Sequence, residues 1–417
     1  MDTRIDRHTR GHAIVVGAGI GGLTAAVALR RAGWRVEVFE RSAELGEVGA
    51  AVLMAPNAVK ALRVLGLGPR LDEAACPLDG LESRSRGGRR ITGVDAEMLK
   101  DRYGAGLHNI HRAVLHRILR NELPEEAIHT GYNAIAVADG ATGASVSFDG
   151  PGGRVSHGAD LVVVADGVGS RLRRVMFPDY AGPVYAGYTV WRGLVPAEQT
   201  RVHDVPALLS ETWGRGARFG IAPIGDGRTY WYAFETAPPG IEHHHSAPAL
   251  AARFDGWHYP IPDLIVATPN DSLLRGDVYY LPEPLPSFTK GRVVLLGDAA
   301  HAVTPDIGQG ACLSIEDGVV LAAMLAQESV PAALRSYDTA RRPRTHALAR
   351  QSGKIGRMLM NPNRIAAGVR DASATVLPAS LAMKSIADAY AWVPPPLPAV
   401  AALVRHPIGM TGCGALY

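Results

Sequence analysis

The sequence predicts an α/β protein: a Rossmann-like nucleotide-binding domain with an inserted, mostly antiparallel β-sheet substrate domain and a C-terminal helical segment. Three observations predict this fold. A strand, a glycine cluster, a helix and a second strand follow one another near the start of the chain. Residues 161–165 and 293–296 are short apolar runs, typical of strands buried on both faces of a parallel sheet. Between these runs the sequence becomes aromatic and alternating, which is typical of antiparallel strands.

The individual elements follow from the spacing of apolar residues. Residues 13–16 predict the first strand, residues 23–29 a helix and residues 36–39 the second strand. Helices are also expected at residues 57–65 and 112–123, because apolar residues recur there at helical spacing.

The inserted sheet is expected at about residues 184–285, and residues 188–191 and 229–232 are two of its aromatic segments. After about residue 361 the chain is rich in alanine and predicts helices. The expected domains are therefore discontinuous. The nucleotide-binding domain takes residues 11–75, 102–178 and 287–360, the inserted domain takes residues 76–101 and 179–286, and a C-terminal helical segment and tail take residues 361–417.

Composition excludes several classes of partner. The 417 residues include 43 basic and 40 acidic ones, so a net charge of +3 predicts no attraction to nucleic acid or to anionic membranes. No apolar run reaches the roughly 20 residues that span a bilayer, and the N-terminus lacks the features of a signal peptide. Three widely spaced cysteines suit a reducing compartment. We therefore expect a cytoplasmic enzyme, either a monomer or a homodimer.

The glycine cluster at residues 17–22 is typical of a dinucleotide-binding turn. Gly17 permits the tight turn, Gly19 lets the backbone approach a pyrophosphate, and Gly22 lets the helix pack closely on the strand. The helix N-terminus then faces the phosphates. Glu40 ends the second strand, where a carboxylate can accept hydrogen bonds from ribose hydroxyls. This pattern alone leaves FAD and NAD open, and it occurs once, so a second dinucleotide would have to bind without a Rossmann unit of its own.

Three later motifs resemble those of the para-hydroxybenzoate hydroxylase-like FAD-dependent monooxygenases. Gly-Asp-Ala-Ala-His at residues 297–301, followed by Pro305 and by Gly-Gln-Gly at residues 308–310, resembles the second FAD motif of that family. Residues 165–171 resemble its middle motif, and Arg112 with Leu115 matches its Arg-x-x-Leu helix. The motifs occur in the family's order over most of the first 360 or so residues.

The resemblance implies that FAD is the bound cofactor and that NADH or NADPH is the electron donor. In this family O2 adds at flavin C4a, and the resulting hydroperoxide transfers OH to an electron-rich carbon. Asp298 would accept hydrogen bonds from the ribityl chain, Pro305 would line the flavin ring, and the backbone at Gly308 and Gly310 would face the flavin pyrimidine ring. The full set of expected FAD-binding residues is Gly17, Gly19, Gly22, Glu40, Arg41, Arg112, Asp166, Asp298, Pro305, Gly308, Gln309, Gly310 and Ala311.

The substrate should be a small aromatic or polycyclic compound. Candidate walls of its site are Tyr188, Trp191, Tyr230 and Tyr232 in the inserted sheet, although aromatic alternation also suits a plain core. Some segments resemble FAD-dependent urate hydroxylases and others zeaxanthin epoxidases, and these families differ in substrate. The urate-type resemblance places Arg218 and Tyr230 near the substrate. We expect Arg218, Arg192 and Tyr230 as catalytic residues, because a guanidinium can bind anionic or carbonyl oxygens; a surface ion pair is the alternative for Arg218.

Other candidates and functions carry less support. We expect His301 to be structural, and the histidines at residues 243–245 to lie in a solvated loop, so no metal is assigned. The alternatives of the same fold are an epoxidase, a halogenase or a polyprenyl reductase acting on a polyene or natural-product intermediate. A non-catalytic flavin-binding protein and a nicotinamide-only dehydrogenase also stay open.

Overall fold

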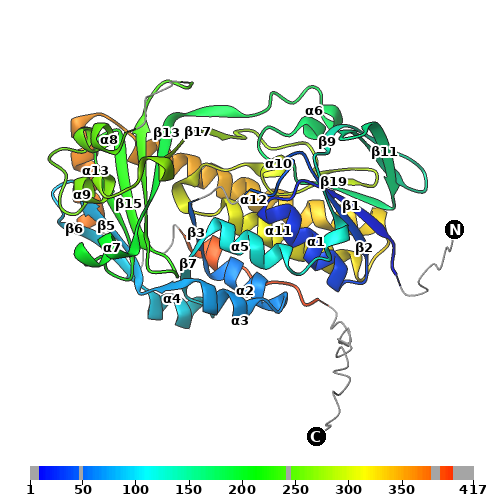
Figure 1. Cartoon of the computed structure of the whole chain (residues 1–417), viewed down its shortest axis with the longest axis horizontal. Helices are drawn as coiled ribbons and strands as arrows, with labels where there is room; N and C mark the ends of the chain where they lie inside the picture. Colours follow the sequence, from blue (N-terminus) through cyan, green and yellow to red (C-terminus); the bar gives the residue numbers. More distant parts are fainter. Residues whose placement is uncertain (1–8, 47–49, 241–245, 377–385, 398–417) are drawn as a thin grey trace, which may run out of the picture.

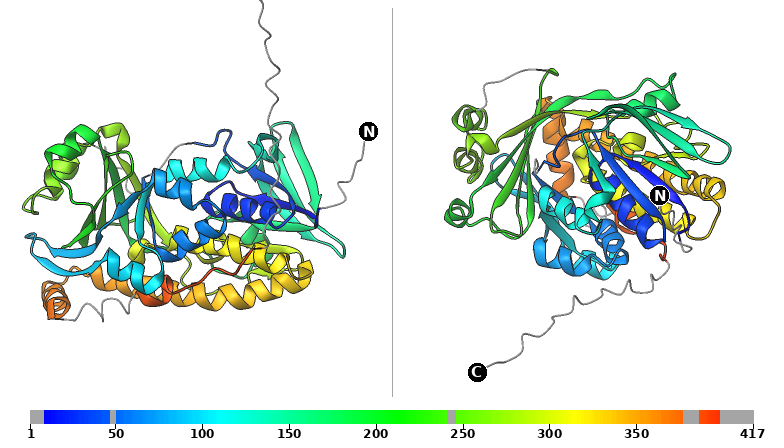
Figure 2. Two further views of the ribbon diagram at one scale, coloured as in Figure 1. Left: turned by 90° about the horizontal axis from the view of Figure 1, so that it is seen from below. Right: turned by 45° about the vertical axis from the view of Figure 1, so that its right-hand side comes forward.

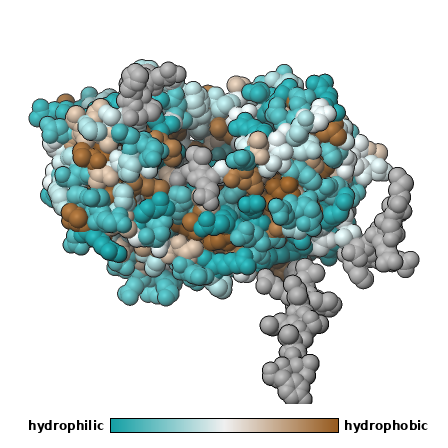
Figure 3. Space-filling model, in the orientation of Figure 1, coloured by the Kyte–Doolittle hydropathy of each residue, from teal (hydrophilic) through white to brown (hydrophobic). Residues whose placement is uncertain are grey.

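The computed structural model describes residues 9–46, 50–240, 246–376 and 386–397. Figure 1 shows two joined parts: an α/β part around β1 and α1, and a large antiparallel sheet around β13 and β15. The long helix α12 runs along both parts. Apolar side chains gather on the surface near the middle of the face in Figure 3, where the two parts meet.

The central sheet of the α/β part has the strand order β18-β19-β12-β1-β2-β8. The strands from β19 to β8 are parallel, and β18 joins as an antiparallel edge. All four residues of β12 are buried, because helices and the small sheet of β9–β11 cover its faces. The six strands are β1 (His12–Val16), β2 (Arg35–Glu40), β8 (Ile128–Thr130), β12 (Leu161–Val164), β18 (Thr289–Lys290) and β19 (Val293–Leu295).

Three helices form the core of this part: α1 (Ile20–Arg31), α11 (Gly310–Leu325) and α12 (Val330–Leu359). α11 packs against α1, α2 and α12, which is why almost all of its side chains are buried. Its residues are apolar all round, as expected for a central helix. The remaining helices of this part are α2 (Pro56–Val64), α3 (Gly68–Ala74), α4 (Ala96–Tyr103), α5 (Arg112–Arg120), α6 (Arg171–Met176) and the short α10 (Asp298–His301).

Two small sheets complete the α/β part. One is the antiparallel meander β9 (Asn133–Asp139), β10 (Ala144–Gly150) and β11 (Gly153–Ala159). The other has the order β3-β7-β4, formed by β3 (Ala51–Met54), β4 (Cys76–Leu78) and β7 (Leu107–His111). The second sheet lies next to the inserted domain, because Asn109 Nδ2 donates to the carbonyl oxygen of Pro223.

The inserted sheet has seven strands in the order β17-β13-β16-β15-β14-β5-β6. All neighbouring pairs are antiparallel except β14 and β5, which are parallel. Its strands are β5 (Gly80–Ser85), β6 (Arg90–Asp95), β13 (Val184–Val195), β14 (Leu209–Trp213), β15 (Ala217–Pro223), β16 (Thr229–Thr236) and β17 (Leu274–Tyr280), with helices α7 (Ala197–Val202), α8 (Ala247–Arg253) and α9 (Ile261–Val266) beside them.

The two faces of this sheet have different neighbours, because successive side chains of a strand point to opposite faces. Trp191, Phe219 and Trp231 project from one face and pack with apolar side chains of α8 and α9. The other face carries Tyr188, Phe234 and Arg218 and meets the end of α12 at Met360. This second face is the one that approaches the α/β part.

The expected fold class is confirmed: a Rossmann-like α/β part, an inserted and mostly antiparallel sheet, and a helical C-terminal segment are all present. The domain limits stay a prediction. Beyond residue 361 the structure has α13 (Arg364–Val376), which lies at the far end of α12 (Figure 2). The expected helical residues Leu381 and Met383, the histidines at 243–245 and the end of the tail lie outside the described residues. Within the described part of the chain, no helix combines the length and hydropathy needed to cross a membrane.

Candidate functional site

The glycine turn between β1 and α1 has the geometry that its sequence predicts. Gly17 has φ +105°, a left-handed conformation, and a Cβ on it would overlap the carbonyl oxygen of Ala165. A Cβ on Gly22 would overlap the carbonyl oxygen of Gly17, so α1 and the turn are in close contact there. Gly19 has no atom within 4 Å of the place where a Cβ would be. The turn therefore leaves an open approach to the N-terminus of α1, where a pyrophosphate is stabilised.

Glu40 lies at the end of β2 beside this turn. Its carboxylate accepts hydrogen bonds from the backbone N–H groups of Ala18 (2.8 Å) and Ser42 (3.0 Å). Glu40 thus fixes the glycine turn relative to the following residues, in addition to the ribose contact expected from the sequence. Arg41, the next residue, is exposed.

Asp298 and Arg112 lie close enough for their charges to interact. Both residues are exposed, although neighbouring parts of the protein partly remove them from bulk water. Removal from bulk water raises the pKa of Asp298, against the effect of the neighbouring His301 and Arg112 charges. The same removal lowers the pKa of Arg112, which Asp298 opposes and Arg192 reinforces. Two expected FAD-binding residues and one expected catalytic residue therefore come together.

Asp166 has a structural role and one free oxygen. Its Oδ2 accepts the backbone N–H groups of Arg171 (3.0 Å) and Leu172 (3.3 Å) at the start of α6. Its buried Oδ1 has no partner. A buried acceptor without a donor is costly, so Oδ1 is suited to a donor from a bound molecule.

The loop from Pro305 to Ala311 leads into α11. Gly308 is left-handed, with φ +63°, and lies near the Leu53 side chain. The side chain of Gln309 is buried, where its Oε1 accepts from Asn57 Nδ2 (2.9 Å). Gly310 and the partly exposed Ala311 begin the helix. The free backbone N–H groups of this first turn can stabilise negative charge on a bound group.

A buried ion-pair network stabilises this loop and the beginning of α11. Arg341 donates from Nε to Asp317 Oδ1 and from Nη1 to Glu316 Oε2, each at 2.6 Å. His301 Nε2 lies 2.6 Å from Asp317 Oδ2, which supports the structural role expected for His301. Asn57 Nδ2 donates to Glu316 Oε1 (2.6 Å) and also to Gln309, so the network reaches the beginning of α11.

The inserted sheet presents a second buried cluster, centred on Arg218. Arg218 Nη2 lies 2.5 Å from Asp306 Oδ1, and Nη1 lies 3.3 Å from Glu211 Oε1. The guanidinium also lies over the Phe234 ring, 4.4 Å from its centroid. Burial opposes the charge, but the two carboxylates raise the pKa of Arg218 by more than burial lowers it. The alternative of a surface ion pair is wrong for Arg218, because its side chain is fully buried.

The four aromatic candidates do not all reach this face. Tyr188, Tyr230 and Tyr232 share it, whereas Trp191 points to the opposite face and packs in the α8–α9 core. The expectation that Trp191 lines the substrate site is therefore wrong. Tyr188 donates to Asp306 Oδ2 (2.8 Å) and Tyr232 donates to Glu211 Oε2 (2.7 Å).

Arg192 and Tyr230 form a separate polar pair on the same face. Both are partly exposed, and Arg192 lies within hydrogen-bonding reach of the Tyr230 hydroxyl. Burial raises the pKa of Tyr230 to about 12, although the Arg192 charge lowers it. The three expected catalytic residues thus divide into the buried Arg218 and the Arg192–Tyr230 pair.

Sequence reasoning missed Glu211, which links Arg218, Tyr232 and Trp213; Trp213 Nε1 donates to its Oε1 at 2.9 Å. Glu211 and Trp213 are two residues apart in β14, so the alternation rule places them on one face, but it gives no partner. The role of Asp306 was also missed, although it follows directly on Pro305 in the expected flavin loop.

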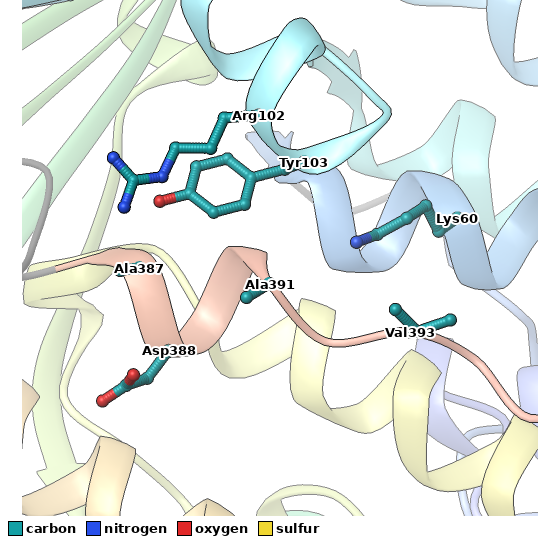
Figure 4. A pocket seen from close by; sticks show the side chains of 7 residues that line it. All are labelled: Lys60, Arg102, Tyr103, Ala387, Asp388, Ala391 and Val393. Carbon is teal, nitrogen blue, oxygen red and sulfur yellow. The ribbon is translucent and has the colours of Figure 1, made fainter.

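A further pocket, of about 340 Å³, lies away from these residues, between α2, α4 and residues 386–397. Figure 4 shows Lys60 and Tyr103 facing this pocket, with the Asp388 carboxylate directed away from Tyr103. Its lining includes none of the residues expected to bind FAD: it consists of Lys60, Arg102, Tyr103, Ala387, Asp388, Ala391 and Val393. Among the described residues, no group of three or more His, Cys, Asp or Glu side chains is arranged to hold a metal ion.

Comparison with known proteins identifies the class. The model of the FAD binding domain family matches residues 10–237 and 284–352. Aurachin C monooxygenase/isomerase of Stigmatella aurantiaca is 39% identical over 360 residues, which are 86% of this chain and 92% of that protein. The FAD-dependent urate hydroxylase of Klebsiella pneumoniae is 35% identical over 82% of this chain and 88% of its own. The chain therefore belongs to the FAD-dependent monooxygenases, as its motifs led us to expect.

Solved structures of similar proteins agree with this assignment to the FAD-dependent monooxygenases. Klebsiella pneumoniae HpxO complexed with FAD and uric acid matches with a TM-score of 0.84 and 30% identity, over 92% of this chain and 98% of that one. A salicylate hydroxylase substrate complex, at 23% identity and a TM-score of 0.73, shares the fold. The residues of this chain fit FAD: the turn at Gly19 is open, Asp298 and Arg112 are exposed, and Asp166 has a free oxygen.

Proposed function

We propose that this protein hydroxylates a small aromatic or heteroaromatic compound, with FAD as its bound cofactor and with NADH or NADPH and O2 as co-substrates. One observation carries the proposal. Arg218, on the inserted sheet, pairs with Asp306 of the expected flavin loop, and Tyr188 of the same sheet face donates to the same carboxylate. The sheet face that carries Arg192 and Tyr230 therefore lies against the expected flavin site.

The relatives support this choice of chemistry. Besides the urate hydroxylase, a 3-amino-4-hydroxybenzoate 2-monooxygenase of Streptomyces cremeus is 36% identical over 84% of this chain. Each of these names describes a hydroxylation or monooxygenation of an aromatic or heteroaromatic ring.

The protein's own task is to hold the substrate and keep water away. When bound, FAD supplies the electron transfer and the activation of O2. The closely packed face of Tyr188, Val190 and Phe234 excludes water, while Arg192 and Tyr230 offer hydrogen bonds that fix the ring's orientation. The first turn of α11 offers N–H groups to negative charge on the reduced flavin.

The test is anaerobic stopped-flow reduction of the FAD-loaded protein by NADH and by NADPH, with and without aromatic compounds. We expect one class of compound to accelerate flavin reduction and to be hydroxylated when O2 is admitted, because substrate binding gates reduction in enzymes that must avoid wasting reducing equivalents. Fast reduction without any compound would favour an epoxidase or oxidase. Absence of reduction by either nucleotide would favour a non-catalytic flavin-binding protein.

A further inference from the structure

We propose that the substrate is a flat aromatic compound that is apolar along most of its edge and presents one acidic or carbonyl oxygen to Arg192 and Tyr230. Arg218, by contrast, braces the flavin loop and does not touch the substrate. The proposal rests on the proposed hydroxylase function and specifies its substrate class.

Arg218 is not available to a ligand. Its side chain exposes no surface, and its guanidinium is held between the carboxylates of Asp306 and Glu211 while it stacks on Phe234. The guanidinium and the two carboxylates together carry one net negative charge. A substrate anion placed here would meet two carboxylates for one guanidinium, so the cluster repels an anion more than it attracts one.

Two of the three tyrosine hydroxyls are also committed. Tyr188 donates to Asp306, and Tyr232 donates to Glu211. A Cβ on Gly220 would overlap the Tyr232 ring, so the Tyr232 ring lies flat against β15 at that glycine. Tyr188 and Val190 are buried, whereas Tyr232 and Leu194 are partly exposed. With its hydroxyl engaged, Tyr232 offers mainly ring surface to a ligand, and Leu194 offers aliphatic surface.

Arg192 and Tyr230 are the polar groups that remain. Among the residues that the structure describes, no ion pair joins Arg192 to a carboxylate, and Arg192 lies within hydrogen-bonding reach of the Tyr230 hydroxyl. Both side chains are partly exposed, so a ligand can reach them. A guanidinium without a counter-ion beside a neutral phenol is suited to bind one anionic or strongly polarised oxygen.

This distribution of polarity selects among substrates. A ring with polar atoms around its whole edge would lose hydrogen bonds to water when it binds. Arg192 and Tyr230 would replace these hydrogen bonds at only one position of the ring. Each polar group that is left without a partner weakens binding. A bicyclic compound with a single oxygen avoids most of this loss, because most of its remaining edge contacts aromatic and aliphatic surface.

The experiment measures binding to the FAD-loaded protein through the change in flavin absorbance, without reductant. The probes are 4-hydroxyquinoline, quinoline, which lacks the oxygen, and urate, which is polar around its edge. We expect 4-hydroxyquinoline to bind at least roughly tenfold more tightly than both others, because a hydrogen bond to a charged group contributes about 1.5–3 kcal/mol. In Arg192→Gln, 4-hydroxyquinoline and quinoline should bind alike. In Arg218→Gln and in the surface control Arg228→Gln, the preference for the oxygen should persist.

Several outcomes would overturn the inference. Urate binding as tightly as 4-hydroxyquinoline would contradict the apolar edge. Loss of the oxygen preference in Arg218→Gln, with its retention in Arg192→Gln, would reverse the two arginine roles, and failure of all three probes to bind would remove the substrate class. These binding results need no nucleotide, so they are independent of the flavin reduction that tests the hydroxylase function itself.

Discussion

Arg218 and Asp306 form a buried ion pair across 88 positions of sequence, with Nη2 2.5 Å from Oδ1. Arg218 belongs to β15 of the inserted sheet, and Asp306 belongs to the turn that leads into α11. The pair therefore joins the sheet that we expect to face the substrate to the loop that we expect to face the flavin. Two further side chains contact this pair: Glu211 accepts from Arg218, and Tyr188 donates to Asp306.

Separate replacement of the two partners should show strong coupling between them. Arg218→Gln leaves Asp306 and Glu211 buried without a cation, and Asp306→Asn leaves Arg218 with Glu211 alone. We expect each single change to lower the free energy of unfolding, and the double variant to be less destabilised than the sum, by about 1–3 kcal/mol. Urea unfolding of the four proteins at saturating FAD measures this coupling. Additive effects would mean that the pair contributes no specific interaction.

The glycine turn allows a prediction that separates folding from cofactor binding. At Gly19 a Cβ meets nothing within 4 Å, so Gly19→Ala should leave the unfolding free energy of the FAD-free protein within about 0.5 kcal/mol. FAD affinity should nevertheless fall roughly tenfold or more, because the methyl group lies where the pyrophosphate approaches. Titration of the FAD-free protein measures this. Gly22→Ala is the contrasting variant: it should destabilise the protein itself, because its Cβ overlaps the Gly17 carbonyl.

The elements of the α/β part could be predicted because their sequence patterns are local. β12 is a continuous apolar run because both its faces are covered, and the glycine turn needs residues that tolerate left-handed or crowded backbone. The sequence also predicted, in part, to which face of the sheet each side chain points. Tyr188 and Trp191 are three residues apart in one strand, so they must point to opposite faces, and alternation alone shows that they cannot both line the substrate site.

The buried clusters could not be predicted in the same way. Arg218 meets Asp306 only because β15 and the flavin loop are brought together by the fold, and no local pattern links residues so far apart. Glu211 has the same difficulty, since its partners Arg218 and Tyr232 lie on two other strands. A single sequence also does not distinguish a buried, doubly paired arginine from an exposed one. For this reason Arg218 and Arg192 were expected to play the same role.

Asp317 should make stability depend on pH in the acid range. Burial raises its pKa, but His301, Arg341 and the Gly297 N–H lower it further, so the folded pKa lies below the unfolded value of about 3.9. A depressed pKa stabilises the fold above the unfolded value, and this contribution is lost as pH falls below it. Below about pH 4 the unfolding free energy should therefore fall about 1.4 kcal/mol per pH unit more steeply than in Asp317→Asn.

Urea unfolding from pH 7 to pH 3 at constant FAD checks this slope. Asp226 is the control, because its pKa is also lowered, by Arg228, but the pair is exposed and screened by water. Asp226→Asn should change the slope much less. Equal slopes for the wild type and Asp317→Asn would show that the buried carboxylate does not titrate with unfolding.

Asp298 should give FAD binding its own pH dependence. Burial raises the pKa of this carboxyl in the FAD-free protein, so it takes up a proton at higher pH than an ordinary aspartate. The ionised form accepts stronger hydrogen bonds, and at both oxygens, than the protonated form, so FAD affinity should fall as pH decreases through the raised pKa. Asp298→Asn should bind FAD roughly 10- to 100-fold more weakly at pH 7, since hydrogen bonds to a charged group contribute about 1.5–3 kcal/mol. It should also lose this pH dependence. Titrations of FAD into both proteins between pH 5 and pH 8 measure the two effects together, and a parallel decline in both would assign the titration to another group.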